Sequence, residues 1–428
     1  MTLAGSSSNL PGPLLILPFA LLLLAIAVMP FAAPHWWERH YAKVSLILGG
    51  FVTGYYLIVF HAPHRVVEAL HEYGSFIILL ASLYIVAGGI HIQVKGESSP
   101  AANLLFLMGG AALANFIGTT GASMLLIRPW IRMNKYRITG FHVVFFILLI
   151  SNVGGALTPI GDPPLFLGFL KGVPFWWTLI HLWKPWLLAV ALLGGIFYLI
   201  DRKNFLRAPT EVRLEEASGE IWKVEGLGNL IPLGAILVAV FLPTPWMEIV
   251  MVVASLLSWH LTPRLIHEKN DFKLEPAKEV AWLFLGIFTT MMPALDYLEH
   301  HAASMASSFG MGPTHFYYAT GLLSSVLDNA PTYLAFVSVE LGLQGGTLNN
   351  PLDVLHVAQS DPIHLIAISM GAVFFGAMTY IGNGPNFMVK SIASGANVHC
   401  PSFFGYILYY ALPILLPVLA LAGWLFLR

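Results

Sequence analysis

The sequence contains few charged residues and only one cysteine. Asp, Glu, Lys and Arg make up 10% of its 428 residues, whereas 57% are apolar. A soluble domain has about 25% charged residues, so this composition excludes an ordinary water-soluble enzyme. The formal net charge of −1 offers no basic surface for nucleic acid. The single cysteine, Cys400, excludes an internal disulfide and a cysteine metal cluster.

Known catalytic motifs are also missing. The sequence has no Walker loop, no Rossmann fingerprint, no HExxH and no GxSxG motif. We therefore expect no enzyme activity and no cofactor. No lysine or arginine precedes the first apolar run, residues 14–33. Because a cleaved signal peptide needs such a basic segment, we expect this run to be retained as a membrane span.

Long apolar runs dominate the chain, and the mean hydropathy is +0.75. A helix needs about 20 apolar residues to cross a bilayer, so the sequence predicts an all-α polytopic membrane protein. Its two halves, residues 1–200 and 227–428, show the same order: three scaffold spans, an interrupted stretch, a broken span and a last span. The predicted elements are 14–33, 44–61, 75–93, 101–127, 140–172 and 177–200, then 227–241, 246–261, 280–297, 315–343, 362–390 and 403–427.

Two segments of the chain are almost identical in pattern. Residues 155–164 read GALTPIGDPP and residues 376–385 read GAMTYIGNGP. Each follows an apolar run and interrupts it with glycine and proline, where a membrane helix would otherwise continue. In secondary transporters, broken helices at corresponding places in two halves line a site near the bilayer midplane. The freed backbone groups are tolerated there because they face a cavity or an ion instead of lipid.

The basic residues indicate the topology. If stretches 101–127 and 315–343 are re-entrant hairpins, most of the 21 basic residues lie on one face of the membrane, as the positive-inside rule requires. Each half then has five crossings, so the second half is inverted relative to the first. The N-terminus is expected in the periplasm, and the linker 201–226 in the cytoplasm, where part of it could form an interfacial helix.

Polar residues at the four predicted breaks suggest an ion site. Thr, Ser and Asn side chains and freed carbonyls supply oxygens that suit sodium, and aspartates at membrane depth are functional candidates by default. Asp162 and Asp328 could alternatively cap the helices that follow them. By the repeat, Asp162 lies opposite Asn383, and Thr119 opposite Asp328. The candidate residues are Thr119, Thr120, Gly121, Ser123, Asn152, Thr158, Gly161, Asp162, Asp328, Asn329, Ala330, Thr332, Thr379, Gly382, Asn383 and Asn386.

Two histidine-containing segments give a weaker indication of function. His61, His64, Glu68 and His71 have helical spacing, but they are expected in an external loop, where an interfacial helix is favoured over a metal site. His142 could relay protons or lie at the cytoplasmic interface.

The motifs TPIGDPP, TYIGNGPN and DNAPT, in the order hairpin then broken helix, resemble the ion transporter superfamily. This group includes arsenite permeases, NhaD-like sodium:proton antiporters, and sodium-coupled citrate and dicarboxylate carriers. The resemblance covers the chain from about residue 14 and implies an elevator-type carrier that forms a homodimer. It also implies two sodium sites, one at Thr119–Gly121 with Thr158, Gly161 and Asp162, and one at Asp328–Ala330 with Thr379, Gly382 and Asn383.

We expect sodium:proton antiport in a bacterial inner membrane, with Na⁺ and H⁺ as coupling ions at Asp162 and Asp328. Carboxylate carriers of this superfamily typically have Ser-Asn-Thr at both hairpin tips, whereas this chain has GTTG and DNAPT. Sodium-coupled uptake of citrate or a dicarboxylate is therefore the second hypothesis, and arsenite-type export the third. A channel would not need two inverted sites, and an intramembrane enzyme would need a catalytic set that is missing.

Overall fold

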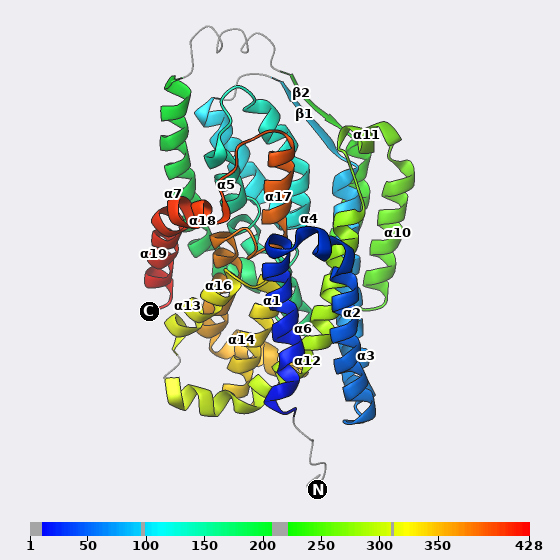
Figure 1. The fold of residues 1–428 in the computed structure, drawn as a ribbon. Coiled ribbons are helices and arrows are strands. Elements are labelled where there is room, and N and C mark those ends of the chain that lie inside the picture. Colours follow the sequence, from blue (N-terminus) through cyan, green and yellow to red (C-terminus); the bar gives the residue numbers. More distant parts are fainter. Residues whose placement is uncertain (1–10, 96–98, 208–220, 310–311) are drawn as a thin grey trace.

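The computed structural model describes residues 11–95, 99–207, 221–309 and 312–428, which form a mostly helical molecule (Figure 1). Within these ranges, eight helices are long and apolar enough to cross a membrane, or nine if one bent pair counts as a span. The prediction of an all-α polytopic membrane protein is confirmed. The inverted repeat, with its five crossings per half, stays a prediction.

The first half contains one helix with an internal break. Gly118, inside the predicted hairpin 101–127, has φ 74° and ψ 155° within α4, where the helix is kinked. A positive φ favours glycine because it has no Cβ. The elements of this half are η1 (Pro13–Ile16), α1 (Leu17–Ala32), α2 (Pro34–Ile58), α3 (Pro63–Gly88), α4 (Pro100–Met133), α5 (Gly140–Leu149), η2 (Val153–Leu157), α6 (Pro163–Lys171) and α7 (Trp177–Arg207).

The second half has a matching interruption. Residues 325–328 separate two helices within the predicted hairpin 315–343. The elements are η3 (Leu227–Asn229), α9 (Leu230–Ala239), α10 (Trp246–Leu261), α11 (Arg264–Lys269), α12 (Glu275–Phe309), α13 (Pro313–Ser324), α14 (Asn329–Leu343), α15 (Pro351–Ser360), α16 (Pro362–Phe375), η4 (Gly376–Met378), α17 (Gly384–Gly395), α18 (Phe403–Tyr406), the π-helix η5 (Ile407–Leu415) and α19 (Leu416–Phe426).

Several helices are longer than their apolar runs. α2 begins at Pro34 instead of residue 44, and α3 begins at Pro63 instead of residue 75. Proline is favoured in the first turn of a helix, and a helix can continue into polar surroundings beyond its apolar part. A helix was favoured for the histidine segment, and His64, Glu68 and His71 lie on α3, whereas His61 lies in the short connection between α2 and α3. Among the described residues, no group of three metal-binding side chains occurs.

A two-stranded ribbon marks one end of the molecule, at the top of Figure 1. β1 (His91–Lys95) pairs antiparallel with β2 (Ile221–Glu225), so His91 lies opposite Glu225. Part of the predicted linker is therefore a strand, where an interfacial helix was an alternative; residues 208–220 lie outside the described residues. The ammonium groups of Lys269 and Lys223 lower the pKa of the Glu225 carboxyl to about 2. We call the end of the molecule that carries this ribbon the strand end.

A buried polar cluster also lies near the strand end, at the last turns of α7. Asp201 is fully buried and pairs with both terminal nitrogens (Nη1 and Nη2) of the Arg137 guanidinium. Its carboxylate also accepts from Asn103 Nδ2 at 2.9 Å and lies 3.1 Å from His142 Nε2. Because His142 Nδ1 accepts from the Thr139 backbone N–H, Nε2 carries the donated hydrogen. His142 is thus a structural partner of Asp201.

Ion pairs join other elements at the opposite end. Arg65 of α3 donates to Asp296 of α12 at 2.5 Å, and Tyr56 of α2 donates to the same carboxylate at 2.8 Å. Lys171, the last residue of α6, lies 2.5 Å from Glu72 of α3. We call this end of the molecule, opposite the strand end, the far end. The Lys171 pair connects the broken span of the first half to α3, and the Asp296 contacts connect α2 and α3 to α12.

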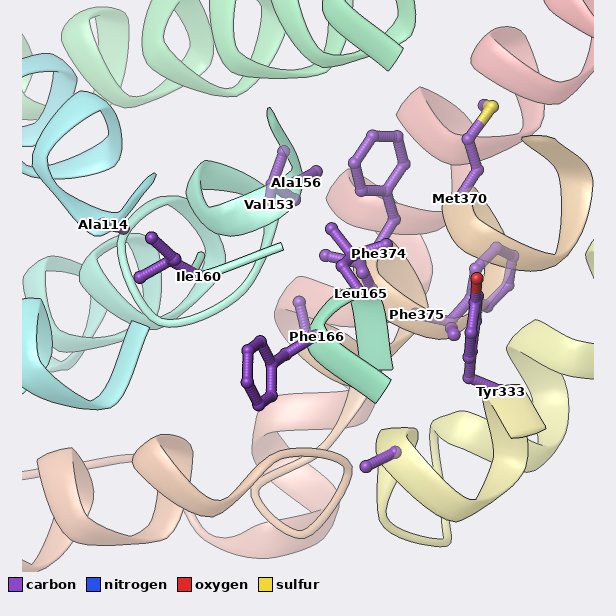
Figure 2. Packing of buried hydrophobic residues seen from close by; sticks show 14 of the residues in the cluster. Ala114, Val153, Ala156, Ile160, Leu165, Phe166, Tyr333, Met370, Phe374 and Phe375 are labelled. Atoms are coloured by element: carbon purple, nitrogen blue, oxygen red, sulfur yellow. The ribbon is translucent and has the colours of Figure 1, made fainter. Parts of the chain in front are cut away.

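The apolar side chains of the two broken spans are buried. Figure 2 shows Val153, Ala156, Leu165 and Phe374, which belong to η2, α6 and α16 and to one hydrophobic cluster. All four are at most 2% exposed, and η2 and α6 both pack against α16. The polar residues of the repeated motifs therefore lie beside a packed apolar core.

We predict that Asp201→Asn lowers the free energy of unfolding by about 3–5 kcal/mol, because a buried guanidinium loses its charged partner. Unfolding of the detergent-solubilised protein measures the change. Asp271→Asn is the matched control: Asp271 is 62% exposed and lies 3.5 Å from Arg128, so a change below about 1 kcal/mol is expected. Equal losses in both variants would contradict the assigned role of the cluster.

Candidate ion-binding site

Both repeated motifs interrupt a helix in the same way. The first lies between α5 and α6 and the second between α16 and α17, and each begins with a 3-10 turn. Thr158 and Thr379 follow these turns with extended backbones, at φ −135° and −141°. Asp162 and Asn383 are the N-cap residues of the next helices, at φ −143° and −153°. The two motifs therefore have the same local backbone.

Glycine pairs bring the two sides of each break together. A Cβ atom on Gly161 would lie 2.1 Å from the Gly155 carbonyl oxygen, and one on Gly382 would lie 2.6 Å from the Gly376 carbonyl oxygen. Side chains larger than hydrogen do not fit at these distances. The repeated glycines are thus required by backbone contact across each break.

Threonine hydroxyls attach each broken span to a hairpin arm. Thr158 Oγ1 donates to the Asn115 carbonyl in α4 at 2.6 Å. In the second half, Thr379 Oγ1 donates to the Ser325 carbonyl after α13 at 2.5 Å. Both bonds use a carbonyl near the end of the first hairpin arm, where helical partners are lacking.

The carboxylate of Asp162 connects four broken segments of the chain. Its Oδ1 accepts from Thr119 Oγ1 in α4 at 2.8 Å and from Asn383 Nδ2 at 3.0 Å. Its Oδ2 accepts from Asn329 Nδ2, at the start of α14, at 2.6 Å. Asp162 is 1% exposed. A buried carboxylate is thus held by three neutral donors from two hairpins and the opposite broken span.

Two further asparagines link the halves beside Asp162. Asn152 Nδ2 donates to Asn386 Oδ1 at 2.7 Å. Asn386 in turn donates to the carbonyls of Gly376 and Thr379, both at 2.9 Å. These amides satisfy carbonyls that the break in the second motif removes from the helical ladder.

Two amide oxygens next to this network lack partners. Asn152 Oδ1 and Asn329 Oδ1 are buried and have no hydrogen-bond partner among the residues that the structure describes. A Cβ atom on Gly376 would lie 3.0 Å from Asn152 Oδ1 and 3.5 Å from Asn329 Nδ2, so both side chains approach one glycine. Leaving such oxygens unsatisfied costs about 1–3 kcal/mol each, and hard cations bind through oxygen ligands. The two oxygens are therefore candidate cation ligands.

Asp328 has a different role in the structure. Its Oδ1 accepts from the Ala330 backbone N–H at 3.0 Å, and its carbonyl accepts from Thr332 Oγ1 at 2.9 Å. The capping alternative thus holds for Asp328. It fails for Asp162, whose side chain makes no capping bond. Thr119 and Asn329, one from each predicted hairpin, both donate to Asp162. The correspondence of Thr119 with Asp328 in the repeat stays a prediction.

The remaining candidates at the first hairpin tip lie around this cluster. Thr120 lines a cavity of about 50 Å³ together with Tyr84 and Met388. Gly121 packs close to Ala87, and Ser123 Oγ lies 2.7 Å from Ser151 Oγ. In the described part of the chain, none of these three residues forms a hydrogen bond with Asp162. The structure therefore gathers Asp162, Thr119, Asn329 and Asn383 into one centre, and the two expected sodium sites stay a prediction.

Comparison with known proteins gives the family. A family model described as "Putative citrate transport" matches residues 8–427. The chain belongs to this family. A relative named "46 kDa membrane protein" from Mycobacterium leprae is 26% identical over 76% of this chain and 80% of its own length. A relative from Mycobacterium bovis, named as an uncharacterized transporter, is 25% identical over 75% of this chain and 78% of its own length. A citrate-transport family member is a transporter rather than an enzyme, and the predicted superfamily is confirmed.

One buried acid was missed in the sequence. Glu340 is 1% exposed and lies in the second arm of a predicted membrane hairpin. The rule that singled out Asp328 applies equally to Glu340, because an acid within a membrane element is a functional candidate. His364, beside it at 3.3 Å, was missed because its position near the start of a broken span resembles an interfacial residue.

We predict that Gly161→Ala reduces stability by about 1–3 kcal/mol, because the added methyl group would overlap a backbone carbonyl. Gly384→Ala is the matched control in the second motif. A Cβ atom there has nothing within 4 Å, and a change of about 0.5 kcal/mol or less is expected. Thermal unfolding in detergent compares the two, and equal stability would show that the first break tolerates a side chain.

Proposed function

We propose that the protein is a secondary transporter that exchanges sodium for protons, and that Asp162 binds both ions in turn. The burial of Asp162 among neutral donors carries this proposal. In the described part of the chain, no lysine or arginine pairs with this carboxylate. A buried carboxylate without a basic partner is stabilised by a cation or by protonation, which are the two states that an antiporter alternates between.

Sodium would use the Asp162 carboxylate and oxygen atoms of residues beside it. Asp162 supplies the charge, and the unpartnered oxygens of Asn152 and Asn329 supply neutral ligands from both halves. Binding would satisfy these oxygens without breaking the bonds that their amide nitrogens donate. Asp328 has one carboxylate oxygen engaged in capping, and its second oxygen supports a second, weaker sodium site.

The matched breaks support an inverted repeat with elevator-type alternating access. In this proposal the two hairpins and broken spans move together against the leading spans of each half, and the working unit is a homodimer. Basic residues at the strand end, such as Arg137, Lys223 and Lys269, support a cytoplasmic position of that end in a bacterial inner membrane. α1 starts at the far end (Figure 1), which agrees with a periplasmic N-terminus.

Asp162→Asn is expected to reduce sodium-dependent proton flux in everted vesicles at least about tenfold, because an amide can neither bind a proton nor neutralise sodium. Asp328→Asn should have a smaller effect. Asp353→Asn is a control for the same chemical change. The Asp353 side chain accepts from the backbone N–H of Thr347, in the loop before α15, and is not part of the Asp162 centre. Unchanged exchange in Asp162→Asn would remove the basis of the proposal.

A second candidate is sodium-coupled uptake of citrate, which the family model favours. Asp162 and the asparagine oxygens would then bind only the coupling ion. Citrate would bind at the adjacent hairpin tips.

Uptake of labelled citrate into proteoliposomes distinguishes the two candidates. Symport predicts that an inward sodium gradient stimulates uptake at least about tenfold, with little proton exchange in the absence of citrate. Antiport predicts sodium-driven proton flux without citrate, and no citrate accumulation.

A further inference from the structure

Glu340 and His364 form a second buried titratable pair, away from the Asp162 centre. Glu340 Oε1 accepts from Gln344 Nε2 at 2.6 Å and lies 3.3 Å from His364 Nδ1. Among the described residues, Glu340 Oε2 is buried without a hydrogen-bond partner, and both ring nitrogens of His364 are buried without one as well. The His364 side chain is 20% exposed and packs against the Phe316 ring. The carboxylate and the ring nitrogens of the histidine are thus enclosed, and only carbon atoms of His364 reach the surface.

No other charged group satisfies Glu340. α14 packs against α6, α12, α13, α15 and α16. Asp361, at the N-cap of α16, interacts electrostatically with His364. In the described part of the chain, Glu340 makes no ion pair or hydrogen bond with any of the other titratable groups that these elements carry at the far end: Lys171 of α6, Asp296, Glu299, His300 and His301 of α12, His315 of α13, and Asp353 and His356 of α15.

Glu340 lies on the helix that contributes Asn329 to the Asp162 centre. Asn329, Tyr333 and Glu340 of α14 have the spacing of one helical face, and Asn329 donates to Asp162. With a rise of about 1.5 Å per residue, Glu340 lies about 16 Å along the axis from Asn329. Tyr333 lies between them, beside Ser369 of α16, and both are buried. Figure 2 shows the Tyr333 side chain next to Phe375 of α16.

We propose that Glu340 and His364 bind a proton at the far end, and that α14, which carries both Glu340 and Asn329, couples this pair to Asp162. The inference rests on the proposed exchange of sodium for protons at Asp162. A proton from the aqueous phase binds a ring nitrogen of His364 when this end is hydrated, and the resulting imidazolium shares it with Glu340 Oε1, so the pair changes from a net charge of −1 to zero. The neutral hydroxyls of Tyr333 and Ser369 provide polar groups between the pair and Asn329. Proton binding at the pair and sodium binding at Asp162 then oppose each other, as exchange requires.

Sodium flux into proteoliposomes, measured with radioactive sodium between about pH 6 and about pH 8, tests this inference. The full chain is used as wild type, Glu340→Gln, His364→Gln and Glu248→Gln. Glu248 is the matched control, because it also has one oxygen bonded, by Ser75 at 2.6 Å, and one buried oxygen without a partner. We expect wild type and Glu248→Gln to vary at least about fivefold over this range, and Glu340→Gln and His364→Gln less than about twofold.

Infrared difference spectroscopy of the purified protein provides a readout that is independent of transport. A pH-dependent carboxyl band that is present in wild type and absent in Glu340→Gln supports the site. The inference is overturned if Glu340→Gln keeps the wild-type pH profile, if wild-type flux does not vary with pH, or if no such band exists. Sodium flux that persists in Asp162→Asn would instead contradict the proposed function. The assignment of the carboxyl band to Glu340 would not depend on that result. If Glu340→Gln does not fold, His364→Gln decides the outcome.

Discussion

The arrangement of this protein depends on a single buried carboxylate. Asp162 accepts hydrogen bonds from Thr119, Asn329 and Asn383, which lie on three segments far apart in sequence. Each donor stands at a helix interruption, so the carboxylate fixes the positions of all four breaks relative to one another. Neutral donors stabilise the ionised form without cancelling its charge. The centre is therefore the structural junction of the two halves and holds an ionisable group inside an apolar core.

Breaking a helix inside a membrane requires that every freed backbone group finds another partner. Here the partners come from the same few residue types in both halves. Thr158 and Thr379 bind carbonyls of the hairpins, and Asn386 binds carbonyls of its own break. Gly161 and Gly382 let the chain fold back on itself. Together these residues explain why the two motifs have so similar a sequence pattern.

The sequence predicted the membrane class, the two broken spans and the helix interruptions at Gly118 and residues 325–328, because hydropathy and helix-breaking residues are local signals. It also identified the side chains around Asp162. It did not predict that Asn329, rather than Asp328, contacts Asp162, because this depends on the rotation of α14 about its axis. Helix ends such as Pro63 and the strand β2 were missed since polar helix turns and short ribbons have no hydropathy signal. The Asp201 cluster depends on contacts between residues up to 98 positions apart, which no local pattern shows.

The pair of Lys171 and Glu72 at the far end has a further consequence. Lys171 ends the short helix that Asp162 begins, and Glu72 belongs to α3; their side chains are only 8% and 14% exposed. Any displacement of α6 along α3 separates these charges, and separated charges need hydration. A displacement of α6, which follows Asp162, would therefore require that water enters between Lys171 and Glu72. The salt concentration on that side of the membrane would influence how readily it occurs, since dissolved ions screen the attraction once the crevice is wet.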